Sequence, residues 1–307
     1  MTFAYITHPD CTRHEMGPHH PECPDRVSVV HERLLASGLL DLAERFEAPA
    51  ATIEQLERAH APSHVLDIRS ATPSAGYAAL DPDTVMNPHT WRAALHAAGA
   101  GVLAAELVAS RRARRAFCNV RPPGHHATRH AAMGFCFFNN VAVSLFHALD
   151  GLGFERVALI DFDVHHGNGS EDIVAGDHRI LMLSTFQSPL YPYSGENPSA
   201  SNIVSVPLAP RTDGAALRAA VSGHWLARLE TFEPQILFIS AGFDAHQDDD
   251  ISHLRWCDDD YAWVTRELVK AANRYAEGRI ISMLEGGYAL AALARSAERH
   301  VRELMEA

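Results

Sequence analysis

Residues able to bind a metal ion gather in one short stretch, Val157 to Ser170, with the sequence VALIDFDVHHGNGS. Its first four residues are apolar and have no helical spacing, which is typical of a strand buried on both faces of a parallel sheet. If the chain stays extended beyond them, the two-residue repeat of a strand puts Asp161, Asp163 and His165 on one side. Carboxylate and imidazole groups bind divalent metals, so the stretch predicts the core of a metal site.

Three other predicted strands also end in polar residues. They are followed by His125 and His126 (after 116–120), by the acidic run 244–250 (after 234–240) and by Tyr288 (after 279–284). The carboxyl ends of parallel strands share one edge of a sheet, and ligands bind at that edge. We therefore expect the four segments to meet in one site.

The residue types indicate which chemistry such a site would perform. Asp163, His165 and one carboxylate from 244–250 would make a three-ligand set that leaves positions open for water and substrate. Zn²⁺ suits this set, and Fe²⁺ or another divalent ion also fits it. His125 and His126 are then placed to transfer protons beside the metal.

Helices alternate with strands along the chain, and this pattern indicates the fold class. Strands are predicted at 4–6, 116–120, 157–160, 179–183, 234–240 and 279–284, and helices at 25–40, 53–60, 91–110, 139–149, 215–231, 259–276 and 289–305. Such alternation is typical of an α/β fold in which helices cover both faces of a mostly parallel sheet. Because the composition does not shift as it would at a linker, we expect residues 1–307 to form a single domain.

Composition limits the classes of partner. The formal charge of −12, from 38 acidic residues against 26 lysines and arginines, disfavours binding to nucleic acid and favours cationic substrates. No apolar run approaches the roughly 20 residues of a membrane span, and the first residues do not resemble a secretion signal. We therefore predict a cytoplasmic protein without a membrane partner, and leave open whether it forms a homo-oligomer. The five cysteines include no CxxC pair, so neither a disulfide framework nor a cysteine zinc site is predicted.

Five motifs occur along the chain in the order RPPGHHA, GFCFFNN, DFDVHHGNG, SAGFDAHQDD and LEGGY. In this order they resemble the metal-dependent histone deacetylase family, which includes bacterial amidohydrolases and acetylpolyamine amidohydrolases. The resemblance implies a single-domain, arginase-like α/β fold with a central, mostly parallel sheet of eight strands flanked by helices. It also implies a zinc-dependent deacetylase, which hydrolyses the amide bond between a small acyl group and an amine.

The resemblance also implies the metal ligands. It makes Asp163, His165 and Asp249 the zinc ligands, with Asp249 chosen because it lies five residues after the aspartate of AGFD, as in the family pattern. Asp244 is then not a ligand. The family often binds a structural K⁺ ion as well. The positions that match this second ion are Asp161, Asp163, His165 and Ser184.

The catalytic roles come from the same comparison of motifs. By resemblance, His126 is the general base and acid, and His125 is its electrostatic partner. Asp161 orients His125, and Tyr288 polarises the carbonyl group of the substrate. Asn168 stands where some relatives have an aspartate behind the histidine pair, so we expect the pKa of His126 to be raised less.

Other positions shape the route to the metal. By resemblance, Phe135 and Tyr191 are the aromatic walls of a narrow tunnel, Gly134 belongs to its floor, and Arg26 lines an inner channel. Ile251 stands where a carboxylate would select the ammonium group of a polyamine.

The substrate is the least determined part of the prediction. Asp248 and Asp250 make an acidic rim that favours a cationic substrate. Acetyl-lysine in a peptide or protein is our first choice. An acetylpolyamine, or another acylated amine or ester, is the alternative. A non-catalytic module that binds an acylated ligand is the rival from a different class.

Overall fold

Eight strands form the central layer of the structure, a computed structural model that describes residues 2–306. Their order across the sheet is β2-β1-β5-β10-β9-β6-β7-β8, and every neighbouring pair is parallel. The strands are β1 (Phe3–Thr7), β2 (Ala43–Glu47), β5 (Arg115–Cys118), β6 (Val157–Asp161), β7 (Ile180–Gln187), β8 (Ile203–Leu208), β9 (Ile236–Ala241) and β10 (Ile280–Leu284). The predicted α/β fold with an eight-stranded sheet is confirmed, and β10, the last strand in the sequence, lies near the middle of that sheet.

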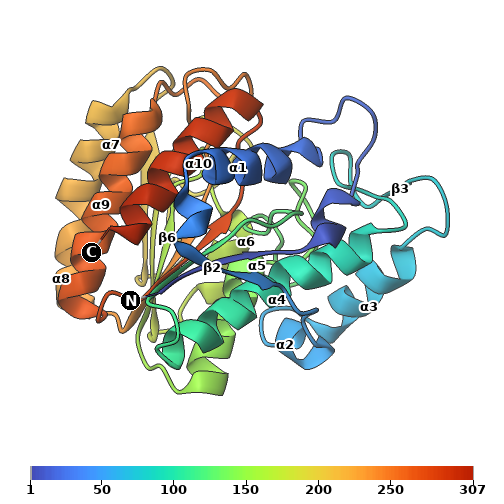
Figure 1. Ribbon diagram of the computed structural model, residues 1–307, viewed down its shortest axis with the longest axis horizontal. Coiled ribbons are helices and arrows are strands. Elements are labelled where there is room, and N and C mark those ends of the chain that lie inside the picture. The colour runs from blue at the N-terminus through green and yellow to red at the C-terminus, as the bar shows by residue number, and fades with distance from the viewer. Residues whose placement is uncertain (1, 307) are drawn as a thin grey trace.

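Two layers of helices cover the sheet (Figure 1). One face carries α2 (Ile53–Glu57), α3 (Pro62–Ala71), α4 (Thr90–Ala109), α5 (Asn140–Phe146) and α6 (Asn168–Val174). The other face carries α1 (Asp25–Ala36), α7 (Gly214–Ala220), α8 (Leu226–Phe232), α9 (Asp258–Tyr275) and α10 (Leu290–Met305). The connections include two short 3₁₀ turns, η1 (Pro9–Thr12) and η2 (Leu39–Asp41), and a hairpin of β3 (Ala78–Ala79) with β4 (Val85–Met86).

Alternation along the buried strands divides the core into two halves. In β6, Val157 and Leu159 pack into the half that contains α4 and α5. Ala158 and Ile160 pack into the half that contains α9 and α10. All five residues of the strand are buried, because helices lie over both of its faces. Because both faces are covered, Val157 to Ile160 are all apolar, and the first polar residue of the strand is Asp161 at its end.

Helix α4 is a core helix although its composition is that of a membrane span. Within residues 2–306 it is the one helix that is long and apolar enough to cross a membrane, but 67% of its apolar window is buried inside the protein. A Cβ atom on Gly99 would lie 1.9 Å from the Pro49 carbonyl oxygen, so glycine is needed for this close packing.

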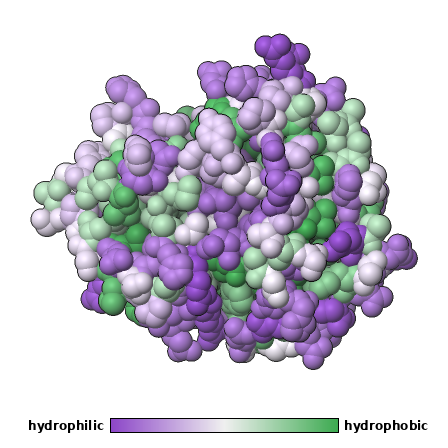
Figure 2. Space-filling view, turned by 180° about the vertical axis from the view of Figure 1, so that it is seen from behind, coloured by the Kyte–Doolittle hydropathy of each residue, from purple (hydrophilic) through white to green (hydrophobic). Residues whose placement is uncertain are grey.

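Figure 2 shows a mostly hydrophilic face with scattered apolar residues. The cytoplasmic location stays a prediction.

Sequence patterns do not predict the two edge strands. β2 and β8 are each partly exposed and therefore lack a continuous apolar run. β7 is also longer than predicted and continues to Gln187. Two predicted helices contain π-helical segments: 139–149 passes from α5 into His147–Gly151, and 215–231 is divided into α7, Val221–Trp225 and α8.

Candidate active site

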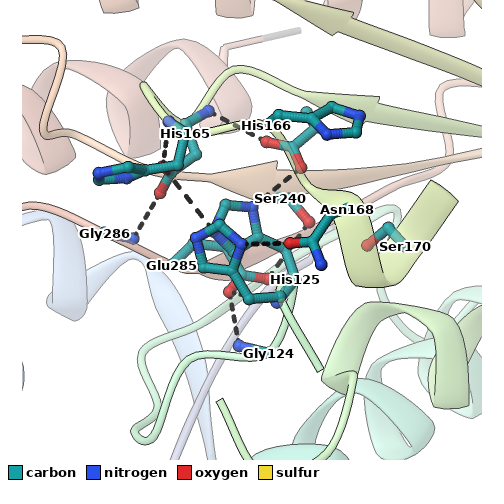
Figure 3. Close-up of polar contacts among 12 residues, drawn as sticks. Gly124, His125, His165, His166, Asn168, Ser170, Ser240, Glu285 and Gly286 are labelled. Carbon is teal, nitrogen blue, oxygen red and sulfur yellow. Dashed lines mark hydrogen bonds and ion pairs between the residues drawn. The ribbon is translucent and has the colours of Figure 1, made fainter. Parts of the chain in front are cut away.

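The four polar segments that we expected to meet follow four neighbouring strands, β5, β10, β9 and β6. His126 comes from the loop after β5 and His165 from the loop after β6, and their ring centroids lie 5.7 Å apart. Gly286, after β10, donates its backbone N–H to Asp163 Oδ2 at 2.8 Å, a contact drawn in Figure 3. The parallel sheet thus brings loops that are far apart in the sequence to one edge.

Asp163, His165 and Asp244 form a cluster whose ligand atoms all lie within 4.8 Å of one another. Nδ1 of His165 lies 3.0 Å from Asp163 Oδ1 and 3.3 Å from Asp244 Oδ2. Burial and the nearby charge of Asp163 raise the pKa of Asp244 to about 6. Asp244 Oδ2 is buried and accepts no hydrogen bond from any residue between 2 and 306. An unpaired carboxylate oxygen beside a second carboxylate and an imidazole fits a divalent cation.

The carboxylate that the structure places beside Asp163 and His165 is that of Asp244, and not that of Asp249, which the resemblance implied as the third ligand. Asp249 Oδ2 accepts hydrogen bonds from the backbone N–H groups of Tyr288 (2.6 Å) and Ala289 (2.9 Å). Asp244 lies just after β9, where its Oδ1 accepts a hydrogen bond from the N–H of Val164 in the metal loop. Asp249, five residues later in the same loop, contacts the loop after β10 instead. Asp249 therefore holds the backbone that carries Tyr288.

The second histidine of the DFDVHHGNG motif points away from the cluster. His166 Nε2 lies 2.8 Å from Glu171 Oε2, and its Nδ1 lies 2.9 Å from the hydroxyl of Ser194. Figure 3 shows the rings of His165 and His166 directed to different sides of the loop. His165 therefore faces Asp163 and Asp244, whereas the adjacent His166 contacts Glu171 and Ser194.

His125 is held by buried carboxylates on two sides. Its Nδ1 lies 3.1 Å from Asp161 Oδ2, as predicted from the resemblance. Its backbone N–H and that of Gly124 donate to Glu285 Oε2, at 3.1 and 2.6 Å (Figure 3). Burial alone would lower the pKa of His125, but Asp163 and Asp161 raise it to about 10. The two carboxylates therefore favour the protonated form of His125.

His126 has the opposite character. Its Nδ1 lies 2.7 Å from the side-chain oxygen of Asn168, an atom that can only accept. Nδ1 therefore carries the ring proton and Nε2 carries the lone pair. Burial and the nearby charges of His125 and His165 hold the pKa of His126 well below its usual range. A neutral imidazole with a free Nε2 is able to accept a proton from water.

A buried ion network that the sequence did not predict supports Tyr288. The guanidinium of Arg26 lies 4.8 Å from the centroid of the Tyr288 ring and donates to the Gly287 carbonyl at 2.7 Å. Glu22 pairs with Arg26 at 3.1 Å and with Arg121 at 2.5 Å, and all three side chains are fully buried. Arg121 begins the RPPGHHA motif and Glu22 lies four residues before Arg26, and these positions were the available signal.

Aromatic rings surround the approach to the cluster. Tyr191 lies 5.2 Å from the His126 ring, and Phe135 lies 5.9 Å from the Tyr288 ring, measured between centroids. A Cβ atom on Gly134 would lie 2.4 Å from Cδ2 of His126, and its φ of +56° also favours glycine. The tunnel itself stays a prediction.

Further residues on this side extend the predicted set. The His20 ring lies 4.8 Å from that of Phe135, and the Thr84 hydroxyl accepts the Phe135 N–H at 3.0 Å. Ile251 is half-buried, and its N–H donates to Asp249. Ser184 pairs in register with Asp161, and within the described chain its buried hydroxyl has no hydrogen-bond partner. The K⁺ site at these two positions stays a prediction.

A model of the histone deacetylase domain matches residues 20–304 of the sequence. The chain belongs to the histone deacetylase family. This family consists of deacetylases and related amidohydrolases, so the resemblance seen in the five motifs is confirmed.

Curated relatives and a solved structure agree with this membership. A probable deacetylase of Archaeoglobus fulgidus is 33% identical over 94% of this chain and 82% of its own length. A histone deacetylase-like amidohydrolase of Pseudomonas aeruginosa is 34% identical over 91% of this chain and 79% of its own. The crystal structure of the HDA15 HD domain matches with a TM-score of 0.93 at 29% identity, over 99% of this chain and 88% of that one.

Proposed function

We propose that this protein is a zinc-dependent amidohydrolase that removes an acetyl or similar small acyl group from an amine. The observation that carries the proposal is the buried Asp244 Oδ2, which has no hydrogen-bond partner among residues 2–306 and lies beside Asp163 and His165, with the neutral His126 next to the cluster. Two carboxylates and one imidazole are the open kind of set that suits catalytic zinc. The names of the deacetylase and amidohydrolase relatives support amide hydrolysis.

The metal-site residues and the two histidines have separate roles in the proposed reaction. Asp163, His165 and Asp244 would hold the ion, which when bound polarises the amide carbonyl and acidifies a water molecule. His126 Nε2 accepts the proton of the attacking water and then donates it to the leaving amine nitrogen. His125, whose Nδ1 is held by Asp161, is the electrostatic partner of His126.

Tyr288 completes this division of roles. Burial raises the pKa of its phenol well above its usual value, although the positive charge of Arg26 acts in the opposite direction. The hydroxyl therefore stays protonated and is able to donate a hydrogen bond to the oxygen that becomes negative as water attacks. Asp249 fixes the backbone at Tyr288, and Glu22 holds the guanidinium of Arg26 beside the Tyr288 ring.

Acetyl-lysine in a peptide is the substrate that we favour. The tunnel walls Phe135 and Tyr191 are aromatic and suit a slender aliphatic stem, and Ile251 adds no charge there. Asp248 contributes less to an acidic rim than the sequence suggests, because it lies 3.0 Å from Arg295 and is paired with it. An acetylpolyamine therefore ranks second, and small acyl esters third.

A pair of aspartate variants tests the proposal. Asp244→Asn should lose stoichiometric active-site zinc and the hydrolysis of an acetyl-lysine peptide together. Asp249→Asn should keep the zinc but lose turnover, because it loosens the backbone of Tyr288. Metal content is measured on the chelator-stripped and reconstituted protein, and turnover on acetyl-lysine peptide, acetylpolyamine and ester substrates. Unchanged turnover by Asp244→Asn, or by metal-free protein, would refute the mechanism.

A further inference from the structure

The second histidine of the DFDVHHGNG motif has no role in the proposed reaction, yet it is buried and both of its ring nitrogens have partners. His166 is 3% exposed and follows the metal-site residue His165. Its Nε2 faces the Glu171 carboxylate, which accepts hydrogen bonds, so Nε2 carries the ring proton. Nδ1 therefore has the lone pair and accepts the hydrogen bond of the Ser194 hydroxyl. The imidazole thus connects two segments of the chain.

Glu171, on helix α6, connects the same segments at a second point. Its Oε2 accepts from His166 Nε2 at 2.8 Å, and its Oε1 accepts the backbone N–H of Ser199 at 2.8 Å. Burial alone would raise the pKa of Glu171, but these two hydrogen bonds lower it, so the carboxylate stays ionised at neutral pH. We name residues 188–199 the entrance loop. The contacts of His166 and Glu171 with its Ser194 and Ser199 are the clasp.

The entrance loop depends on the clasp because it has no buried side chains of its own. None of residues 188–200 is buried, and Tyr193 is 80% exposed. The Tyr193 N–H donates to the Leu190 carbonyl, a contact that stays inside the loop. The loop also lies against the His166 ring, since a Cβ atom on Gly195 would be 2.5 Å from its Cδ2. Exposed side chains hold a loop weakly, so the buried polar contacts determine its position.

Tyr191 is the residue of the entrance loop that faces the proposed chemistry. Its ring centroid lies 5.2 Å from that of His126 and 6.3 Å from that of His165. Helix α6, which carries one half of the clasp, also carries Asn168, the hydrogen-bond partner of His126. The clasp therefore places Tyr191 relative to the same helix that orients His126.

We propose that His166 and Glu171 are positioning residues that set the width of the approach to the metal cluster by holding Tyr191 beside His126. The inference rests on the proposed function, because it concerns how an acylated amine reaches the cluster. A fixed aromatic wall contacts an unbranched methylene chain along its length, whereas a mobile wall loses part of that contact. The clasp therefore favours a long, slender amine such as the lysine side chain. A short ligand that contacts little beyond the metal gains nothing from it.

Two zinc-binding probes of different length test this inference. Acetohydroxamate is the short ligand, and octanohydroxamate carries an unbranched chain that reaches the aromatic wall. Glu171→Ala breaks both of its contacts in the clasp, so the Kd of octanohydroxamate should rise roughly tenfold, as expected when about two methylene groups lose apolar contact. The Kd of acetohydroxamate should not change. Both are measured by calorimetry on zinc-loaded protein. With an acetyl-lysine peptide, KM should rise by the same factor while kcat is kept.

A conservative variant and a neighbour on the same helix provide the controls. Glu171→Gln keeps both contacts, because its amide oxygen accepts the Ser199 N–H and its amide N–H donates to His166 in the other tautomer. It should bind both probes as wild type does. Asp172→Ala removes an exposed carboxylate that accepts the backbone N–H of Arg129 and does not contact the entrance loop. It should also leave both Kd values unchanged.

Hydrogen–deuterium exchange tests the clasp independently of the chemistry. Amides of the entrance loop should exchange faster in Glu171→Ala than in wild type or Glu171→Gln, whereas those of β6 should not. Ser194→Ala removes one exposed hydroxyl and should give the same changes to a smaller degree, even if the first variant folds poorly. If acetohydroxamate does not bind the wild-type protein, the proposed zinc site fails, and exchange in the loop still decides whether the clasp holds Tyr191. Unchanged exchange, or equal weakening of both probes, overturns the inference.

Discussion

Replacing Glu22 with glutamine should lower the free energy of unfolding by about 3 to 5 kcal/mol, the usual cost of removing one partner of a buried ion pair. Both oxygens of Glu22 are in use: Oε1 faces Arg26 at 3.1 Å and Arg121 at 2.5 Å, and Oε2 faces Arg121 at 2.5 Å. All three side chains have 0% exposure, so water cannot solvate the two guanidinium groups once the carboxylate charge is removed. Glutamine keeps the shape but leaves two buried guanidinium groups facing a neutral amide.

The measurement is urea unfolding of the zinc-loaded protein at 25 °C and neutral pH. Glu54→Gln is the matched control, because Glu54 pairs with Arg58 at the same 3.1 Å distance but is 82% exposed. Its loss should stay within about 1 kcal/mol, as for other surface pairs. Turnover of Glu22→Gln should also fall without loss of active-site zinc, since Arg26 supports Tyr288. A loss for Glu22→Gln no larger than that of the control would refute the reasoning.

Three other predictions follow from single contacts. Gly134→Ala places a methyl group 2.4 Å from the His126 ring, so turnover should fall roughly 10- to 100-fold with zinc content unchanged. Asn168→Asp puts a negative charge 2.7 Å from His126, so its pKa should rise and the acid limb of the kcat/KM profile should move to higher pH. Burial lowers the pKa of His300 to about 3, so the unfolded chain binds a proton that the folded chain does not as pH falls below about 6.5. The free energy of unfolding should then decrease with falling pH by up to ~1.4 kcal/mol per unit from this residue, and His300→Asn should reduce that slope by about one proton.

Each of these has a simple contrary result. Gly223 has open space around its Cα, so Gly223→Ala should leave turnover unchanged, and equal effects at both glycines would contradict the steric argument. An unmoved acid limb in Asn168→Asp would show that another group limits the reaction. An identical pH slope of stability in His300→Asn would mean that this histidine is protonated in the folded protein.

The sequence predicts the centre of the sheet better than its edges. The fully buried strands are read correctly because both of their faces are apolar, as in Val157 to Ile160. The edge strands β2 and β8 have one neighbour each and expose part of their residues. The alternation of apolar and polar residues in β2 and β8 is weak. These segments are strands because β2 pairs with β1 and β8 pairs with β7.

The site is predictable to the level of the loop, but not of each side chain. Residues 244–250 offered several carboxylates, and spacing alone cannot tell which one turns toward His165 and which one caps backbone N–H groups. The resemblance implied Asp249, five residues after Asp244, whereas the structure places Asp244 beside His165. The role of Glu22 could not be assigned either, because its partner Arg121 lies 99 positions away in the sequence.

The place of β10 in the sheet governs the order in which the molecule can be completed. Strands β2, β1 and β5 form one block and β9, β6, β7 and β8 form another, and β10 is the strand that joins them. Of the eight strands of this sheet it is also the last to be synthesised. His125 and His126 belong to the first block and the metal cluster to the second, so the histidines meet the metal ligands only when β10 is inserted between β5 and β9. A nascent or truncated chain that ends before residue 280 therefore has the histidine pair and the metal cluster, but it lacks Tyr288 and the strand that brings the two groups together. Such a long-range closing step makes late, slow folding the expected behaviour of this chain.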